Sequence, residues 1–201
     1  MKKLLFLFAF VFAFTACSVS NEKKAESLIK DSIQKVLIFP DSYDPIEMQL
    51  DSAFTPQHDP SFIQLCLDFN EKGVELESLQ EDIAMAEREK SLYNPSLSAY
   101  FRTRYQQAVE KYNSLIQKNE LLTGQLKKLG EELTAQATKE PEFIGYFAHQ
   151  SYRAKNNAGD TLMGDKYFLL DKDVSSILYV WDKEDIELYD AFLTQLANLE
   201  E

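Results

Sequence analysis

A short segment late in the chain places two basic side chains beside an aromatic one. The segment Tyr152-Arg153-Ala154-Lys155-Asn156 reads as a β-strand, in which every second residue points to the same face, so Arg153 and Lys155 face the same way. Two such cations could hold a carboxylate or an anionic sugar. The alternative, which we favour, is that both pair across a β-hairpin with an acidic residue, namely Asp165, Asp171 or Asp173.

Aromatic residues suggest a second binding surface. On one face of a sheet, Tyr146, Tyr152 and Trp181 could stack against a glycan or hold a peptide. Most aromatic residues of this chain, however, occur at the spacing of a hydrophobic core. The sequence therefore favours core packing, and a ligand surface made of these three residues with Arg153 and Lys155 is the alternative.

No pattern in the sequence is typical of a catalytic or metal site. Serine, histidine and aspartate all occur, but no nucleophile lies in a recognisable elbow and no glycine-rich phosphate loop is present. The two histidines, His58 and His149, are far apart, whereas metal ligands cluster at characteristic spacings. We therefore expect no enzymatic activity, no cofactor and no metal ion.

The first residues have the layout of a secretory signal peptide. Lys2 and Lys3 precede an apolar run over residues 4–14, and the small residues Thr15-Ala16 lead into Cys17. The run is about half of the roughly 20 residues that a membrane-spanning helix needs. We predict cleavage after residue 16, so that the mature chain begins at Cys17.

A cysteine directly after the small residues resembles the lipobox of bacterial lipoproteins, although Phe14 stands where that family usually has leucine. The resemblance implies acylation of the Cys17 thiol and of the new N-terminus, and a lipid anchor in the cell envelope. Ser18 lacks the acidic signal for retention in the inner membrane, which favours the outer membrane. The alternative is ordinary secretion with a chance cysteine at the cleavage site.

The second cysteine, Cys66, lies between two leucines and is expected to be a buried hydrophobic residue. The alternative is a reactive or intermolecular thiol. If Cys17 carries lipid, Cys66 has no partner for a disulfide within the chain.

The net charge of −12 limits the classes of partner. Removal of Lys2 and Lys3 with the signal peptide makes the mature chain −14. Phosphate backbones would repel such a chain, which argues against a nucleic-acid partner. Anionic lipid headgroups would repel it too, so membrane attachment is expected to come from the lipid on Cys17.

Hydrophobic periodicity predicts a helix over residues 22–38, a turn over 40–45 and a half-buried strand from Ile46 to Phe54. Two long helices, with apolar residues three or four apart, follow over 59–138 and are interrupted at Tyr93-Asn94-Pro95-Ser96. The second has a heptad repeat, so we predict an antiparallel coiled-coil hairpin. Folding this hairpin about Asn94 places Phe69 near Asn119, which is a polar residue in the apolar seam. We expect Asn119 to fix the register, with a ligand role as the alternative.

The last part of the chain returns to β structure. Strands are predicted over residues 144–153, 161–170 and 177–181, the first two joined by a hairpin turn at 156–160, and an amphipathic helix over 186–196 follows. The predicted fold class is α+β, with an antiparallel sheet of three to four strands, flanking helices and the long hairpin as an insertion. The expected organisation is a signal peptide (1–16), a lipidated tether (17–24), a small α+β domain (25–58 and 139–201) and the hairpin (59–138).

Three separate stretches, Pro40-Asp41-Ser42-Tyr43, Phe143-Ile144-Gly145-Tyr146 and 152–156, together with Gly159, resemble small bacterial envelope proteins of unknown activity. This resemblance implies a fold and a lipoprotein character only. Our leading hypothesis is a non-enzymatic envelope lipoprotein that uses the hairpin as an arm or a dimerisation surface. Apolar residues outside the seam, such as Tyr100, Phe101 and Ile116, would indicate a partner, whereas a polar exterior would indicate a spacer.

Overall fold

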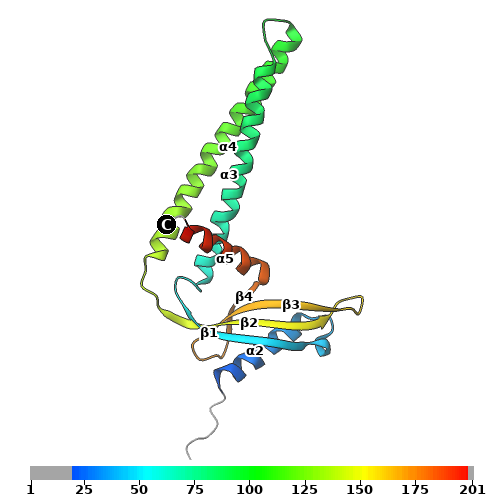
Figure 1. The fold of residues 1–201 in the computed structure, drawn as a ribbon, viewed down its shortest axis with the longest axis vertical. Coiled ribbons are helices and arrows are strands. Elements are labelled where there is room, and N and C mark those ends of the chain that lie inside the picture. The colour runs from blue at the N-terminus through cyan, green and yellow to red at the C-terminus, as the bar shows by residue number, and fades with distance from the viewer. Residues whose placement is uncertain (1–19, 199–201) are drawn as a thin grey trace, which may run out of the picture. The chain divides into compact units, whose positions relative to one another are not determined.

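The computed structural model describes residues 20–198, so the predicted signal peptide, Cys17 and the start of the tether lie outside the described residues. The α+β fold is confirmed, with a four-stranded antiparallel sheet in the order β1-β2-β3-β4 (Figure 1). Along the chain the elements are α2 (Asn21–Val36), the 3-10 turn η2 (Pro40–Ser42), β1 (Asp44–Phe54), α3 (Pro60–Leu92), α4 (Ala99–Ala137), β2 (Phe143–Lys155), β3 (Thr161–Leu170), β4 (Ile177–Asp182) and α5 (Lys183–Asn198).

The chain divides into two compact units. Within the described residues, the sheet unit contains 20–53 and 143–183, and the hairpin unit contains 54–142 and 184–198. The C-terminal helix therefore belongs with the hairpin, whereas the sequence suggested that it belongs with the α+β domain. The reason is packing: the Phe192 ring lies 5.8 Å from the Phe69 ring, and the Tyr189 hydroxyl donates to the Gln57 carbonyl at 2.9 Å.

The core of the sheet unit forms where α2 packs against the sheet. The helix begins where the Ser20 side chain accepts a hydrogen bond from the Lys23 N–H, and it ends before the extended residue Leu37. Its buried stripe contacts inward-facing residues of β2 and β3. The buried core is Ala25, Ile29, Ile33, Ala148, Tyr152, Ala154, Phe168, Leu170 and Val174.

Strands β2 and β3 form the predicted hairpin, in register from Tyr146 opposite Leu170 to Lys155 opposite Thr161. The turn closes with Gly159 at φ 87°, a backbone conformation that glycine adopts without strain. The register fixes which side chains share a face. Even-numbered residues of β2 point toward α2, and odd-numbered residues point to the opposite face.

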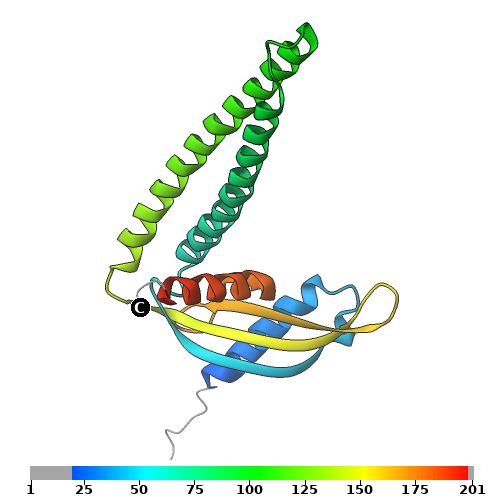
Figure 2. The same ribbon diagram turned by 45° about the horizontal axis from the view of Figure 1, so that its top comes forward.

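The hairpin unit contains two long antiparallel helices (Figures 1 and 2). Helix α3 has 33 residues and begins at Pro60 after the capping residue Asp59, whose side chain accepts from the Ser61 N–H. Helix α4 has 39 residues and is capped by Ser98, whose hydroxyl accepts from the Phe101 N–H. Buried residues along the two arms include Leu79, Ala86, Ala108 and Leu122.

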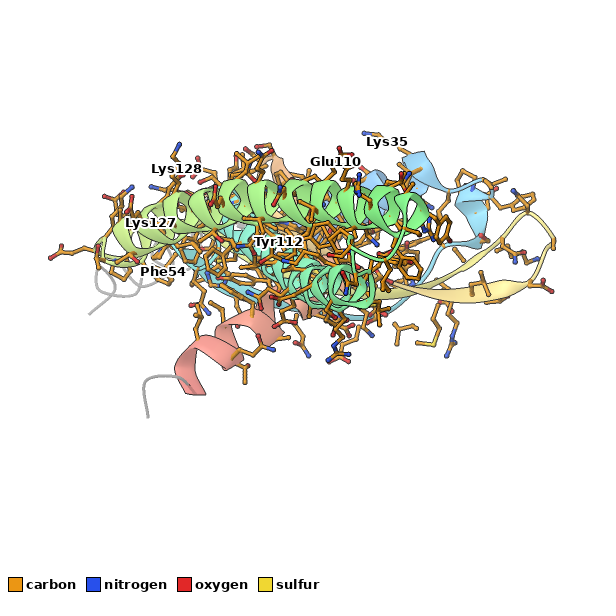
Figure 3. All side chains as sticks on the ribbon, turned by 90° about the horizontal axis from the view of Figure 1, so that it is seen from above. Lys35, Phe54, Glu110, Tyr112, Lys127 and Lys128 are labelled. Carbon is orange, nitrogen blue, oxygen red and sulfur yellow. The ribbon has the colours of Figure 1, made fainter. Side chains whose placement is uncertain are left out.

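Ion pairs and a cation–π contact connect the arms. Lys118 pairs with Glu75 at 2.9 Å and Lys111 with Glu89 at 3.2 Å, while the Lys90 ammonium lies 4.2 Å from the centre of the Tyr112 ring. Tyr112 lies on the side of α4 that faces α3 (Figure 3).

The predicted register of the hairpin is wrong. A Cβ atom at Gly130 would lie 3.5 Å from the Phe69 ring, so Phe69 faces Gly130 and not Asn119. The physical reason is the connection between the arms. The chain continues past Asn94 through Pro95 to Ser98 before α4 begins, which shifts each partner toward the end of α4.

Candidate functional site

The two basic residues singled out by the sequence line a hollow in the sheet unit. The hollow has a volume of about 640 Å³ and opens to solvent. Its lining residues come from η2 and the residue before it, from the start of β1, from the end of β2, from the turn that follows and from the first residue of β3. They are Phe39, Asp41, Ser42, Asp44, Arg153, Lys155, Gly159 and Thr161.

Ser42 joins the two sides of this hollow. Its hydroxyl donates to the Phe39 carbonyl at 2.6 Å, which closes the η2 turn, and accepts from the Lys155 N–H at 2.9 Å. Beside this bond the Tyr43 ring lies 5.6 Å from the Tyr152 ring, and burial raises the pKa of both phenols. The Pro40–Tyr43 and Tyr152–Asn156 segments of the resemblance therefore meet in space, although Ser42 and Lys155 are 113 residues apart.

The favoured pairing of the basic residues is wrong. A guanidinium nitrogen of Arg153 lies 3.7 Å from a carboxylate oxygen of Asp44, and both side chains are exposed. The three predicted aspartates are not involved: Asp165 binds other residues, Asp171 accepts from Ser175 and Ser176, and no ion pair involves Asp173 among the described residues. Within residues 20–198 the Lys155 ammonium forms no ion pair, so it can meet an incoming carboxylate.

The three aromatic residues of the alternative surface do not share a face. Tyr146 and Tyr152 point toward α2 and belong to the core or pack against it. Trp181 lies opposite Tyr167 on the other face, 5.7 Å from the Phe147 ring and 4.5 Å from the Tyr179 ring, and is buried. The physical reason is the two-residue period of the strands, and a stacking platform built from Tyr146, Tyr152 and Trp181 is therefore ruled out.

A polar cluster that no pattern in the sequence indicated lies on this opposite face. Asp165 accepts hydrogen bonds from the Ser151 hydroxyl and lies 3.0 Å from His149 Nε2, while the Lys183 ammonium is 3.9 Å away. The His149 ring stacks on the Tyr167 ring at 4.4 Å. The hydrogen bond from Ser151 is the main cause that holds the pKa of Asp165 below its ordinary value.

The cluster lacks the order of a nucleophilic triad. In such a triad the histidine stands between the serine and the aspartate, whereas here the carboxylate binds both neighbours. The cluster could have been found by folding the predicted hairpin about its 156–160 turn, because Ser151 lies directly opposite Asp165. The arrangement ties β2 to β3.

The hairpin unit exposes large apolar residues where its two arms are joined and also along the arms, where Val74, Met85 and Leu121 are 60%, 57% and 65% exposed. We define the hairpin tip as residues 88–104. Three of its large side chains are mostly exposed, Leu92 at 72%, Leu97 at 67% and Tyr100 at 64%. Of the residues predicted to lie outside the seam, Tyr100 is exposed, while Phe101 and Ile116 are half-buried. Phe101 packs beneath Tyr93 and Tyr100, with ring centres 6.3 and 5.8 Å apart.

An apolar hollow of about 500 Å³ lies within the hairpin unit, lined by α3, the end of α4 and α5. Its lining includes Cys66, Phe69, Leu133, Phe192 and Leu196. Burial raises the pKa of the Cys66 thiol from 9.0 to about 12, so this side chain is a buried hydrophobic residue, as the sequence predicted.

Across residues 20–198 no three metal-binding side chains gather into a group, and no helix has the length and apolar character to cross a bilayer. Comparison with known proteins finds no matching family model, no similar curated protein and no similar solved structure.

Proposed function

We propose that this chain is a lipid-anchored protein of the bacterial cell envelope that acts without catalysis, using its helical hairpin to reach a partner. The proposed anchor rests on the lipobox-like residues before Cys17. The observation that carries the role of the hairpin is the exposure of Leu92, Leu97 and Tyr100 together at the tip. A spacer would expose polar residues there, because exposed apolar groups without a partner cost solubility.

The length of the arms fits this role. The 33 residues of α3 extend for about 50 Å at 1.5 Å per residue. The long arms therefore place the tip far from the other end of the hairpin. Away from the tip the hairpin exposes charged residues such as Lys127 and Lys128 (Figure 3), as well as the apolar residues of the arms named above.

Two measurements in the native host test the proposal. The first compares radiolabelled palmitate incorporation and membrane fractionation of the wild type and Cys17→Ala. Loss of label and of membrane association in the variant supports the anchor, whereas an unlabelled, soluble wild type contradicts it.

The second measurement places a photoreactive amino acid at Tyr100 and, as a control, at Lys128. We expect a covalent adduct with an envelope component, protein or lipid, from position 100 and not from position 128. Equal yields of adduct at the two positions, or no adduct at either, would contradict the proposal that the tip contacts a partner.

A second candidate function is the binding of a carboxylate-bearing glycan or peptide in the hollow of the sheet unit. It is favoured by the free Lys155 ammonium beside the exposed Arg153 in a hollow of ligand size. Screening of anionic glycans against the wild type and Lys155→Ala, with Lys172→Ala as the exposed control, tests it. Binding that Lys155→Ala abolishes would support this function, and binding unaffected by Lys155→Ala would contradict it.

A further inference from the structure

We propose that the hairpin tip docks on the surface of an anionic lipid bilayer. This inference rests on the proposed function, because it assumes that the hairpin is the acting part, and it names the partner. It also revises the expectation from net charge that anionic headgroups would repel the protein. That expectation treated the negative charge as evenly distributed over the chain, whereas the net charge of the tip is positive.

The tip is the basic part of an acidic chain. Residues 88–104 contain four basic side chains, Arg88, Lys90, Arg102 and Arg104, and one carboxylate, Glu89, which leaves +3 against −12 for the whole chain. Three of the four arginines of the chain lie in this segment. Glu87, the next carboxylate, would reduce the charge to +2 if it were included.

The tip's positive charge is available to a partner. Glu89 is paired with Lys111, which lies outside the tip, at 3.2 Å. Arg88 and Arg102 are exposed and form no ion pair within the described part of the chain. Arg104 is exposed as well, and its guanidinium carbon lies 5.6 Å from the centre of the Tyr93 ring in a cation–π contact.

The exposed apolar residues have the composition of a bilayer interface. Leu92 and Leu97 flank the turn between the arms, and Tyr100 follows in the first turn of α4. Leucine inserts below the headgroups, tyrosine lies at their level, and the surrounding arginines contact lipid phosphates. Within the tip, the Phe101 ring contacts the rings of both Tyr93 and Tyr100.

The small size of the apolar group favours a bilayer over a folded protein. A stable protein interface buries about 800 Å² on each partner in a complementary shape. Three exposed side chains on a narrow turn supply much less than this area. A bilayer needs no complementary shape, because each inserted side chain gains apolar contact independently.

The acidic remainder of the hairpin does not prevent such docking. At 0.1 M salt, charges more than about 10 Å apart at a surface are largely screened. The arms extend for about 50 Å, so most carboxylates of the hairpin lie well beyond this distance from the tip.

The test uses the purified full chain with Ser96→Cys labelled by an environment-sensitive dye. Ser96 is exposed, and its hydrogen bond to Asn94 uses only its backbone N–H. The wild type treated with the same dye gives the background labelling, and Gln117→Cys, exposed on α4, is the control position. Vesicles are pure phosphatidylcholine or phosphatidylcholine with phosphatidylglycerol.

We expect a saturable blue shift at position 96 with phosphatidylglycerol vesicles, reversed by 0.5 M salt, and none with phosphatidylcholine. Position 117 is expected to show no shift. The double variant Arg88→Gln/Arg102→Gln should weaken binding at least about tenfold. The matched control Lys127→Gln/Lys128→Gln should change it less than about twofold, because these lysines lie away from the tip.

Leu97→Gln tests separately how much the apolar side chains contribute to bilayer insertion. It should abolish the blue shift of the dye at position 96. Circular dichroism checks that each variant remains helical, as expected for exposed positions.

The outcomes separate the inference from the function on which it rests. No shift at position 96, or an equal shift with both vesicle types, overturns bilayer docking. If photocrosslinking at Tyr100 then yields a protein adduct, the hairpin still acts, with an acidic protein as its partner. If neither method detects contact at the tip, both the inference and the proposed role of the hairpin fail.

Discussion

At the scale of single residues, Gly164 shows how closely the sheet unit is packed. Gly164 lies opposite Tyr152, and a Cβ atom there would lie 2.6 Å from Cζ of the Tyr152 ring. Gly164→Ala should therefore displace this buried ring and lower the free energy of unfolding by about 1–3 kcal/mol. Urea unfolding measures the effect.

The control for this prediction is Gly73→Ala in α3. A Cβ atom at Gly73 meets nothing within 4 Å, so the substitution should stabilise the helix by up to about 1 kcal/mol. Equal effects of the two substitutions would show that packing against Tyr152 is not the cause.

The Cys66 thiol should be unreactive in the folded protein. Its pKa of about 12 leaves very little thiolate at neutral pH, and burial blocks access. In the variant Cys17→Ser, Cys66 is the one remaining cysteine. Its reaction with a thiol reagent should be slow in buffer, where the protein is folded, and fast in concentrated urea, where it is unfolded. Rapid labelling of the folded chain would instead support the alternative of a reactive thiol.

Protonation of Asp171 should contribute to the loss of stability at acid pH, because its carboxylate holds the turn before β4. Its carboxylate accepts hydrogen bonds from the Ser175 hydroxyl and N–H and from Ser176, which lower its pKa from 3.8 to about 2. These bonds close a turn in which Val174 adopts a positive φ of 52° and is buried. Because the folded pKa is depressed, the stabilisation is present above pH 3.8 and is lost as the pH falls toward 2.

Asp171→Asn removes this charge. We expect its free energy of unfolding to fall less than that of the wild type across this pH window, and urea unfolding at several pH values measures the difference. Parallel pH profiles of the two proteins would contradict the assignment.

At the scale of elements, Asn119 weakens the hairpin. Its Oδ1 atom is buried and has no hydrogen-bond partner in the described structure, and such a group costs about 1–3 kcal/mol. Asn119→Leu should raise the free energy of unfolding by about 1 kcal/mol. Asn113→Leu, at an exposed position of the same helix, is the matched control and should have little effect.

The proposed role of Asn119 in fixing the register makes a second prediction. A leucine there should permit other pairings, which analytical ultracentrifugation would detect as a shift in oligomeric state. If Asn119→Leu instead lowered the free energy of unfolding, the buried Oδ1 atom would not be destabilising the wild type. A more stable variant that remains in the wild-type oligomeric state would argue against a role in register.

Most of the elements could be predicted from the sequence, because each has a local cause. Pro40 and Pro60 mark helix boundaries, and Asn156 to Gly159 make a turn that fixes the β2–β3 register. The hairpin register was wrong because a heptad pattern is compatible with several offsets, and the length of the connection decides among them. The hollow beside Lys155 joins segments 113 residues apart, and no local pattern predicts that contact.

At the scale of the whole molecule, each unit has its own core. Phe192 on α5 is buried beside Phe69 in the hairpin unit. Phe192→Ala should cost about 3 kcal/mol, and hydrogen exchange should accelerate at the start of α3 and the end of α4. Exchange in β2 and β3 should remain unchanged.

Leu188→Ala, at an exposed position of the same helix, is the control and should leave exchange unaffected. Faster exchange in β2 and β3 of the Phe192 variant would show that the two units unfold together.

The assignment of α5 to the hairpin unit also sets an order of events during synthesis. The hairpin unit needs α5, which is made after β4, and the sheet unit needs β1 and β2 from either side of the hairpin insertion. Neither unit can complete its core until synthesis has passed the hairpin, and the hairpin unit must also wait for α5. A chain that ends early therefore leaves Cys66 and Phe69 uncovered, and proteases that recognise exposed apolar residues can distinguish it from the finished protein.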